Sequence, residues 1–301
     1  MLRIGLIGCG KWGEVVANEI RKHNFFNLAS VVCNSKFKYD GDFVHLNRIK
    51  ESINKEINDC LYVAALPSTN MEVVKLASEI KMPLIIEKPS VDNYSHALEL
   101  RKLVKDKNLI VFPNTTNYFS ETYKKIKFFV DTNLNNIEKL TIFEGGFGPF
   151  RKNIHPIWDW GYHPLSLIIH LFKDNKFSNF QMSEIKNNLL DSKKIVSRFN
   201  FKINKNISVK LVTGNFFKTK KRVLKISLKN KQYYLCDMIE HKLYFNNKNI
   251  HKNKISPLNS ILNNFYLDIK NQDNNLSKNL IDTSCIVTEI LEKFYPNSRN
   301  Q

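Results

Sequence analysis

The first two dozen residues constrain the fold of this chain more than any other stretch. Residues 2–7 form an apolar run, residues 8–13 read Gly-Cys-Gly-Lys-Trp-Gly, and an amphipathic helical pattern follows at once. The pyrophosphate of a dinucleotide requires a strand, a G-x-G-x-x-G turn and a helix in this order. Gly8 allows the tight turn, Gly10 lets the backbone approach the phosphates, and Gly13 lets helix and strand pack closely. A glycine-rich turn without a ligand is the alternative.

Length and composition indicate a folded protein of two domains. The chain has 301 residues, of which 43% are hydrophobic, and only 10 Gly and 9 Pro. It contains no apolar run of the roughly 18 residues that a membrane span needs, and it enters its first strand directly, so we expect no membrane segment and no signal peptide. The 5 cysteines are scattered and form no C-x-x-C pair, which predicts reduced thiols in a cytoplasmic protein.

The formal net charge of +18 does not by itself identify a partner. The lysines are spread over the whole length and mixed with asparagines, as at residues 246–249, which indicates a compositional bias and not a patch. No helix-turn-helix, zinc or RNA-binding signature accompanies the charge, so we expect no nucleic-acid partner. A small substrate that carries phosphate suits the charge equally well.

Strands and helices alternate over the first 115 or so residues. Strands are expected at 28–33, 60–66, 83–86 and 109–112. One helix is expected to follow residues 67–70 and to end at residue 80, and another is expected at 94–106. This alternation predicts an α/β domain with a right-handed, doubly wound parallel sheet, the Rossmann arrangement. Ligands bind at the carboxyl ends of such strands. Cys9, Asn34, Pro67, Lys88 and Asn114 are expected at those ends.

The end of the second strand bears on the choice of cofactor. An acidic residue about 20 positions beyond the glycine turn would hold the 2′-hydroxyl of NAD. This chain has Cys33, Asn34, Ser35 and Lys36 there, which favours NADP over NAD. The alternative is that the lysines of this segment are solvated loop residues, and the choice stays open.

The pattern changes beyond a helix expected at 121–130. A strand at 137–143 runs into three glycines at 145, 146 and 148, which suit either a ligand cradle or, more commonly, a bulge or strand exit. Alternating apolar and polar residues at 194–203 and 207–211, with strands at 223–228 and 232–236, predict an antiparallel meander. Helices near 257–270 and 279–294 close the chain. We therefore predict a Rossmann domain over 1–119 and an α+β domain with a mainly antiparallel open sheet over 120–301.

Two spots besides the glycine turn carry residues suited to chemistry. Lys88 directly follows a buried strand and precedes a proline, which places it at the ligand edge of the sheet, although on spacing alone a surface lysine at a strand exit is the commoner explanation. Asp159 and His163 lie four residues apart at a helix start and so share one face. A carboxylate beside an imidazole raises its basicity and fixes its tautomer, as a general acid or base requires. The alternative makes Asp159 a helix cap and His163 a packed helix residue.

A metal site is not expected. It would have to recruit His155 or His170, and His170 lies seven residues, or two helical turns, beyond His163. No further Cys/His cluster completes a site.

Together these motifs resemble one known family. An N-terminal G-x-G-x-x-G unit, Glu87-Lys88-Pro89 after a later strand and an Asp-x-x-x-His helix start are similar to those of the Gfo/Idh/MocA (glucose–fructose oxidoreductase/inositol dehydrogenase) proteins. The resemblance covers nearly the whole chain. It implies NAD(P)-dependent oxidation or reduction of a sugar, inositol or sugar nucleotide. It also implies that Lys88, Asp159 and His163 act at the reacting carbon, with the substrate against the sheet domain.

The resemblance assigns further residues to each ligand. The expected cofactor contacts are Gly8, Gly10, Lys11, Trp12, Gly13, Asn34, Ser35, Leu66, Pro67, Ser68, Asn70, Glu87 and Lys88. The expected substrate contacts are Lys88, Asn114, Asn117, Tyr118, Arg151, His155, Trp158 and His163. Two positions depart from the family pattern: Asn70 stands where a histidine is frequent, and Ser166 replaces a carboxylate that commonly follows the helix histidine by three residues.

These observations predict a cytoplasmic NAD(P)-dependent dehydrogenase or reductase that acts on a secondary alcohol or ketone of a sugar or sugar nucleotide. We expect a homo-oligomer formed through the C-terminal sheet domain. A cofactor-retaining binding or regulatory protein of the same fold, without turnover, is the competing hypothesis.

Overall fold

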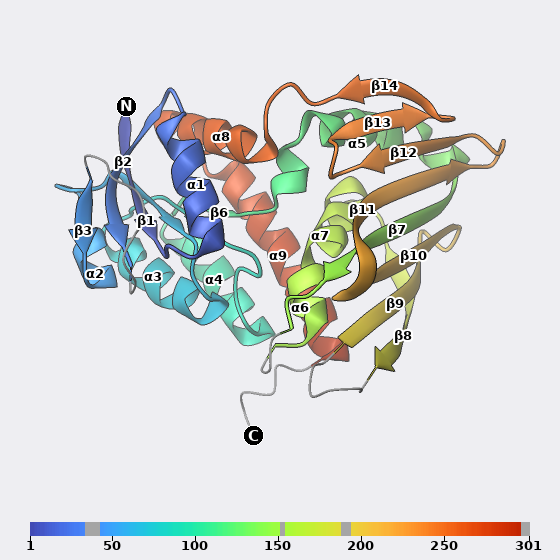
Figure 1. Cartoon of the computed structure of the whole chain (residues 1–301), viewed down its shortest axis with the longest axis horizontal. Coiled ribbons are helices and arrows are strands. Elements are labelled where there is room, and N and C mark those ends of the chain that lie inside the picture. The colour runs from blue at the N-terminus through green and yellow to red at the C-terminus, as the bar shows by residue number, and fades with distance from the viewer. Residues whose placement is uncertain (34–42, 151–153, 188–193, 296–301) are drawn as a thin grey trace. The chain divides into compact units, whose positions relative to one another are not determined.

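The computed structural model comprises all 301 residues and describes residues 1–33, 43–150, 154–187 and 194–295 (Figure 1). The chain divides into two compact units. The first unit contains residues 1–114 and 258–289, and the second contains residues 115–257 and 290–301.

The first unit is built on a six-stranded sheet in which every strand pair is parallel. Its strands are β1 (Leu2–Ile7), β2 (Phe26–Val32), β3 (Val44–Leu46), β4 (Cys60–Val63), β5 (Leu84–Ile86) and β6 (Val111–Pro113). Their order is β3-β2-β1-β4-β5-β6, the doubly wound arrangement. The predicted Rossmann fold is therefore confirmed. In this order the strand sequence reverses direction between β1 and β4, and ligands of such sheets bind at that switch point.

Helices accompany this sheet, and the longer ones have an apolar stripe to bury against it. They are α1 (Lys11–Arg21), α2 (Ile49–Ser52), α3 (Pro67–Glu79), α4 (Tyr94–Asp106), α8 (Pro257–Asn271) and most of α9 (Asn275–Phe294). Val73, Val74 and Ala77 of α3 are fully buried in the same apolar cluster as Ile86 of β5, as the periodicity predicts. The short helix α2 and strand β3 were not predicted, because neither is long enough to show a period.

The two closing helices extend the first unit, whereas the predicted boundary assigned residues 120–301 to one domain. Ile281 and Cys285 of α9 lie in the same apolar cluster as the strands of the parallel sheet. Phe265 of α8 packs edge-on against Phe112, with ring centroids 5.3 Å apart. These helices bury apolar surface on the parallel sheet, and that burial is why residues 258–289 group with the N-terminal residues.

The second unit contains an eight-stranded sheet. Its strands are β7 (Ile137–Phe147), β8 (Phe177–Asn187), β9 (Lys194–Ile203), β10 (Ile207–Gly214), β11 (Phe216–Leu228), β12 (Tyr233–Asp237), β13 (Lys242–Phe245) and β14 (Lys248–Lys252). Their order is β14-β13-β12-β11-β7-β10-β9-β8, and only β7 and β10 pair in parallel. The predicted mainly antiparallel sheet is thus confirmed. The structure adds β8, β13 and β14, which the pattern did not indicate.

Helical segments accompany this sheet in the second unit. They are η1 (Thr116–Phe119), α5 (Glu121–Asn133), η2 (Leu134–Asn136), α6 (Pro156–Trp160) and α7 (Tyr162–Leu171). Gly145 and Gly146 belong to β7, and a side chain on Gly146 would meet the Trp160 ring 2.9 Å away. These two glycines therefore permit close packing within the unit. The partner strand β11 has a register shift opposite them, as the bulge interpretation expected.

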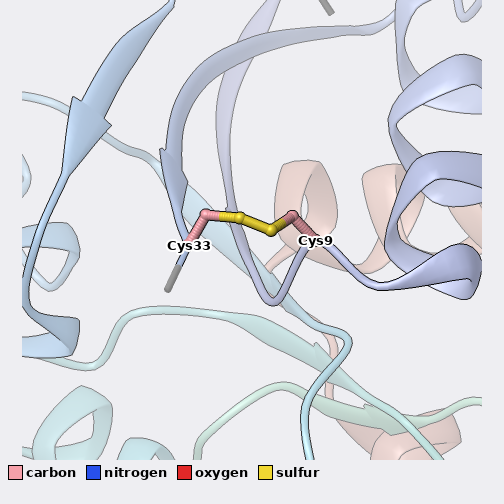
Figure 2. The surroundings of a disulfide bond; sticks show 2 residues. All are labelled: Cys9 and Cys33. Carbon is pink, nitrogen blue, oxygen red and sulfur yellow. A yellow bond between two sulfur atoms is a disulfide. The ribbon is translucent and has the colours of Figure 1, made fainter. Parts of the chain in front are cut away.

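Cys9 and Cys33 are joined by a disulfide, which corrects the prediction that all cysteines are reduced (Figure 2). Parallel pairing of β1 with β2 brings the end of one strand beside the end of the other, and this proximity could not be inferred from a separation of 24 residues. Cys60, Cys236 and Cys285 are buried free thiols. Among the described residues, no helix is long and apolar enough to cross a membrane.

Candidate functional site

The three glycines of the turn after β1 have different surroundings. Gly8 has a φ of +97°, and a Cβ there would lie 2.5 Å from the carbonyl oxygen of Ala64. A Cβ on Gly13 would lie 2.2 Å from the carbonyl oxygen of Gly8. A Cβ on Gly10 would meet no atom within 4 Å. Gly8 and Gly13 are therefore needed by the fold itself, whereas Gly10 faces open space.

Helix α1 begins next to that open space. Gly10 is its N-cap and has no side chain to cap the first turn. The first intrahelical hydrogen bond runs from Glu14 N–H to the Gly10 carbonyl at 3.0 Å, so the N–H groups before Glu14 have no acceptor within the helix. Such N–H groups, together with the helix dipole, attract an anion. Lys11, the first helical residue, is exposed and adds a positive charge. The turn fits the pyrophosphate of a dinucleotide.

A buried carboxylate links this turn to the central strands. Glu87, at the end of β5, accepts hydrogen bonds from the Tyr62 hydroxyl at 2.8 Å and from Asn114 Nδ2 at 2.5 Å. The indole N–H of Trp12 in α1 also donates to it. Burial raises the pKa of Glu87, and the donors from Asn114, Tyr62 and Trp12 oppose that shift. The network joins four elements at the carboxyl edge of the sheet.

The loop that carries Lys88 is fixed on both sides. Asn70 of α3 is fully buried, and its Nδ2 donates to the carbonyls of Glu87 at 3.0 Å and Ser90 at 3.1 Å. Lys88 is partly exposed, although both of its neighbours in the chain, Glu87 and Pro89, are buried. The asparagine that departs from the family pattern thus holds the loop in place, and Lys88 is the residue that the loop presents at the sheet edge.

Asp159 and His163 lie in the second unit on either side of Gly161. Asp159 is the next-to-last residue of α6 and is partly exposed, whereas His163 lies in the first turn of α7 and is 7% exposed. Gly161 has helical angles, φ −77° and ψ −25°, and its N–H donates to the carbonyl of Ile157 at 2.7 Å. The backbone therefore keeps nearly helical spacing between the two side chains.

A row of polar side chains crosses the sheet of the second unit. Five residues lie directly opposite one another on five successive strands, from β11 to β8: Arg222, Glu144, Thr213, Ser197 and Glu184. Residues in direct register project from the same face of a sheet. Glu144 and Thr213 are fully buried, and Ser197 is 1% exposed. The charges of the row are paired within the protein, since Nε of Arg222 lies 3.3 Å from Oε1 of Glu144 and a buried carboxylate is costly without such a partner.

His155 lies against the β8 end of this row. It is the N-cap of α6, its ring stacks on Tyr295 at 3.6 Å between centroids, and its Nε2 lies 3.3 Å from Oε1 of Glu184. The Ser197 hydroxyl donates to the same Glu184 oxygen at 2.8 Å. His155 thus lies beside the polar row, in the element that leads to Asp159.

The other predicted residues have the following surroundings. Asn117 is 8% exposed, and the ring of Tyr118 packs 4.3 Å from that of His170. Trp158 is 1% exposed and donates to the carbonyl of Tyr295 at 3.3 Å, so it belongs to the core of its unit. Leu66 and Pro67 form the start of α3, followed by Ser68. Asn34, Ser35 and Arg151 lie outside the described residues.

Sequence reasoning missed several polar residues. Tyr62 lies within a buried strand, and only a hydroxyl in an otherwise aliphatic run marks it. Ser197 lies on the inward face of the strand predicted at 194–203, Glu144 lies one residue beyond the strand predicted at 137–143, and Glu184 lies in β8, which was not predicted. A buried carboxylate at an inward strand position is the signal that could have drawn attention to them. Within the described residues, no group of three or more His, Cys, Asp or Glu side chains could hold a metal ion.

Residues 2–115 match a family model described as the oxidoreductase family with an NAD-binding Rossmann fold. This part of the chain is therefore similar to the NAD-binding domains of that family. The family of this model is Gfo/Idh/MocA, the same family that the motifs of the sequence resemble. Comparison with curated protein sequences finds no match.

Solved structures share the fold over nearly the whole chain. UDP-N-acetylglucosamine 3-dehydrogenase GnnA from Acidithiobacillus ferrooxidans is 16% identical with a TM-score of 0.78, covering 97% of this chain and 98% of its own. GenD2 from gentamicin A biosynthesis, in complex with NAD, is 12% identical with a TM-score of 0.80, covering 100% and 95%. Biliverdin reductase from Synechocystis sp. PCC 6803, in complex with biliverdin and NADP+, is 13% identical with a TM-score of 0.73, covering 97% and 98%. At these identities the likeness establishes the fold alone.

Proposed function

We propose that this protein is a cytoplasmic NAD(P)-dependent oxidoreductase that transfers a hydride between nicotinamide and a secondary alcohol or ketone carbon of a sugar or sugar nucleotide. The observation that carries the proposal is the geometry of the glycine turn. Gly8 and Gly13 are packed against backbone, while Gly10 leaves open space at the start of α1, at the switch point of the parallel sheet. That space suits a pyrophosphate, and the family match supports the same cofactor.

Residues of the first unit would hold the dinucleotide. The N–H groups of the first turn of α1 and Lys11 would bind the pyrophosphate, Trp12 and Gly13 complete the turn, and Leu66 to Asn70 line the neighbouring strand end. When bound, the nicotinamide supplies or accepts the hydride. One structural neighbour is in complex with NAD and another with NADP+, so the proposal includes both cofactors. The preference for NADP rests on Asn34 and Ser35.

Lys88 is proposed to act on the reacting oxygen. Its loop is held by Asn70 and by the buried Glu87, so the backbone that carries the Lys88 side chain is fixed. A cation at that position stabilises the negative charge that develops on the oxygen of an alcohol losing its proton. The lysine therefore either polarises the oxygen or shares its proton.

His163 is proposed to exchange the hydroxyl proton, with Asp159 orienting its ring. An imidazole can accept the proton of the alcohol in oxidation and return it in reduction, and a carboxylate partner keeps the ring in the useful tautomer. His155 would bind the substrate through one of its hydroxyl groups, because an imidazole nitrogen can accept or donate a hydrogen bond. Asn114, Asn117, Tyr118, Arg151 and Trp158 complete the proposed substrate contacts. A homo-oligomer formed through the second sheet is part of the same proposal.

The test is a binding and turnover assay on the full chain. Calorimetric titration with NAD and with NADP would measure cofactor affinity, and the absorbance of reduced nicotinamide would report turnover on a panel of sugars and sugar nucleotides. We expect binding of at least one dinucleotide and turnover of at least one panel member, both abolished in Gly10→Val. Binding without turnover would favour a non-catalytic protein of this fold, and absence of binding would refute the proposal.

A further inference from the structure

Two cysteines sit at the two strand ends on which dinucleotide binding is proposed to depend. Cys9 lies between Gly8 and Gly10, and Cys33 is the first residue after β2. A disulfide joins them, with their Cα atoms 5.6 Å apart (Figure 2). This separation is common for disulfides. Both residues are partly exposed, whereas the other three cysteines are buried, so only this pair is open to a reagent from solvent.

The sheet itself brings the two sulfur atoms together. Ile7 is in register with Val32 in the parallel pair β1–β2, and the N–H of Gly8 donates to the Val32 carbonyl at 2.9 Å. The backbone bonds of these neighbours do not depend on the disulfide. Reduced thiols would therefore stay close to each other, and the disulfide could form again as an intramolecular step.

We propose that Cys9 and Cys33 form a reversible redox modification site, whose reductant is a dithiol and whose disulfide state favours dinucleotide binding. The inference rests on the proposed function for the binding half. A thiolate of the dithiol attacks one protein sulfur, the Cys9–Cys33 bond breaks, and a mixed disulfide forms. The second thiol of the reductant then releases the protein. The protein gains two electrons and two protons as two thiols, and the dithiol leaves as a disulfide.

Charge gives the first reason why the disulfide form binds more tightly. Cys9 immediately precedes Gly10, the N-cap of α1. A reduced cysteine beside a helix N-terminus is shifted toward its thiolate, which is negatively charged. That charge would repel the pyrophosphate and compete for the N–H groups that bind it. The disulfide carries no charge and leaves those groups to the ligand.

Preorganisation gives the second reason. The turn at Cys9 would contact the pyrophosphate, and the end of β2 at Cys33 would lie near the adenosine ribose, in the usual placement of a dinucleotide on this fold. A covalent link between the two strand ends fixes their separation before the ligand arrives. Binding then requires less ordering of the protein, so affinity rises. Reduction removes the link and adds the charge, and both changes weaken binding.

The experiment uses the full chain in two redox states. One sample is treated with oxidised dithiothreitol and the other with reduced dithiothreitol, and both are alkylated under denaturing conditions and weighed by mass spectrometry. We expect the 3 free cysteines to be labelled in the oxidised sample and all 5 in the reduced one. Calorimetry on matched unlabelled samples should show dinucleotide affinity lower by roughly tenfold after reduction, as one added charge near the phosphates would produce. Affinity should return after re-oxidation.

Two variants serve as controls. Cys33→Ser cannot form the disulfide, so its affinity should be the same with and without reductant. Cys285→Ser keeps the disulfide and removes only a buried thiol, so it should respond to reductant like the natural chain. Labelling of all 5 cysteines after oxidation would overturn the modification site. Equal affinity in both states would overturn the link to binding and leave the proposed function standing, whereas absence of binding in both states would overturn the link and the proposed function together.

Discussion

Replacing Gly10 with valine separates the needs of the cofactor from the needs of the fold. A Cβ at Gly10 meets no atom within 4 Å, so the new side chain enters open space and not the protein interior. The backbone there has a φ of −67° and a ψ of −178°, an extended conformation that valine adopts readily. We therefore expect Gly10→Val to fold with a free energy of unfolding within about 1 kcal/mol of the natural chain.

The substitution is expected to weaken dinucleotide binding. The valine methyl groups would occupy the space in front of the first turn of α1, where the pyrophosphate is proposed to bind. Each charge-assisted hydrogen bond that the phosphates lose contributes about 1.5–3 kcal/mol. Since about 1.4 kcal/mol corresponds to a factor of ten, loss of even one such bond weakens dinucleotide binding roughly 10- to 100-fold.

Gly13→Ala is the matched variant for this experiment. Its Cβ would lie 2.2 Å from the carbonyl oxygen of Gly8, so the helix must move away from the turn and unfolding stability should fall by about 1–3 kcal/mol or more. Calorimetric titration and thermal unfolding on the same samples measure both quantities. Unchanged affinity in a folded Gly10→Val protein would refute the assignment of this turn to a pyrophosphate.

Three further predictions concern the residues of both units. Lys88→Ala should lower turnover far more than cofactor affinity, because its charge is needed at the reacting oxygen; saturation kinetics with calorimetry separate the two effects. His163→Ala should reduce turnover about 10²–10⁴-fold, and Asp159→Asn should also slow the reaction, whereas a merely packed histidine would lower the melting temperature and spare turnover. Burial, aided by Lys173, lowers the pKa of His170 to about 3. Between about pH 6.5 and 3 the unfolded chain therefore binds a proton at His170 that the folded chain does not bind, so stability falls as the pH decreases. Melting temperatures of His170→Gln should decrease less over this pH range than those of the natural chain.

The local pattern of the sequence contained much of the candidate site. Gly8, Gly10 and Gly13 could be given separate roles because the spacing of a strand, a turn and a helix is short and self-contained. The position of Lys88 at the end of β5 followed in the same way from an apolar run and a proline. By contrast, the partners that hold its loop, Asn70 and the Glu87 network, come from other strands and helices, so no local pattern could reveal them.

Sequence alone thus determined the class of each sheet and the residues at the carboxyl edge of the parallel one, because hydrophobic periodicity and turn chemistry act over a few residues. Tertiary structure decided what long-range packing controls. Strand order placed Cys9 beside Cys33, register aligned Glu144 with Thr213 across two strands, and burial of apolar surface drew the closing helices to the parallel sheet. Each of these outcomes joins segments far apart in the chain, and their proximity depends on how whole strands and helices pack.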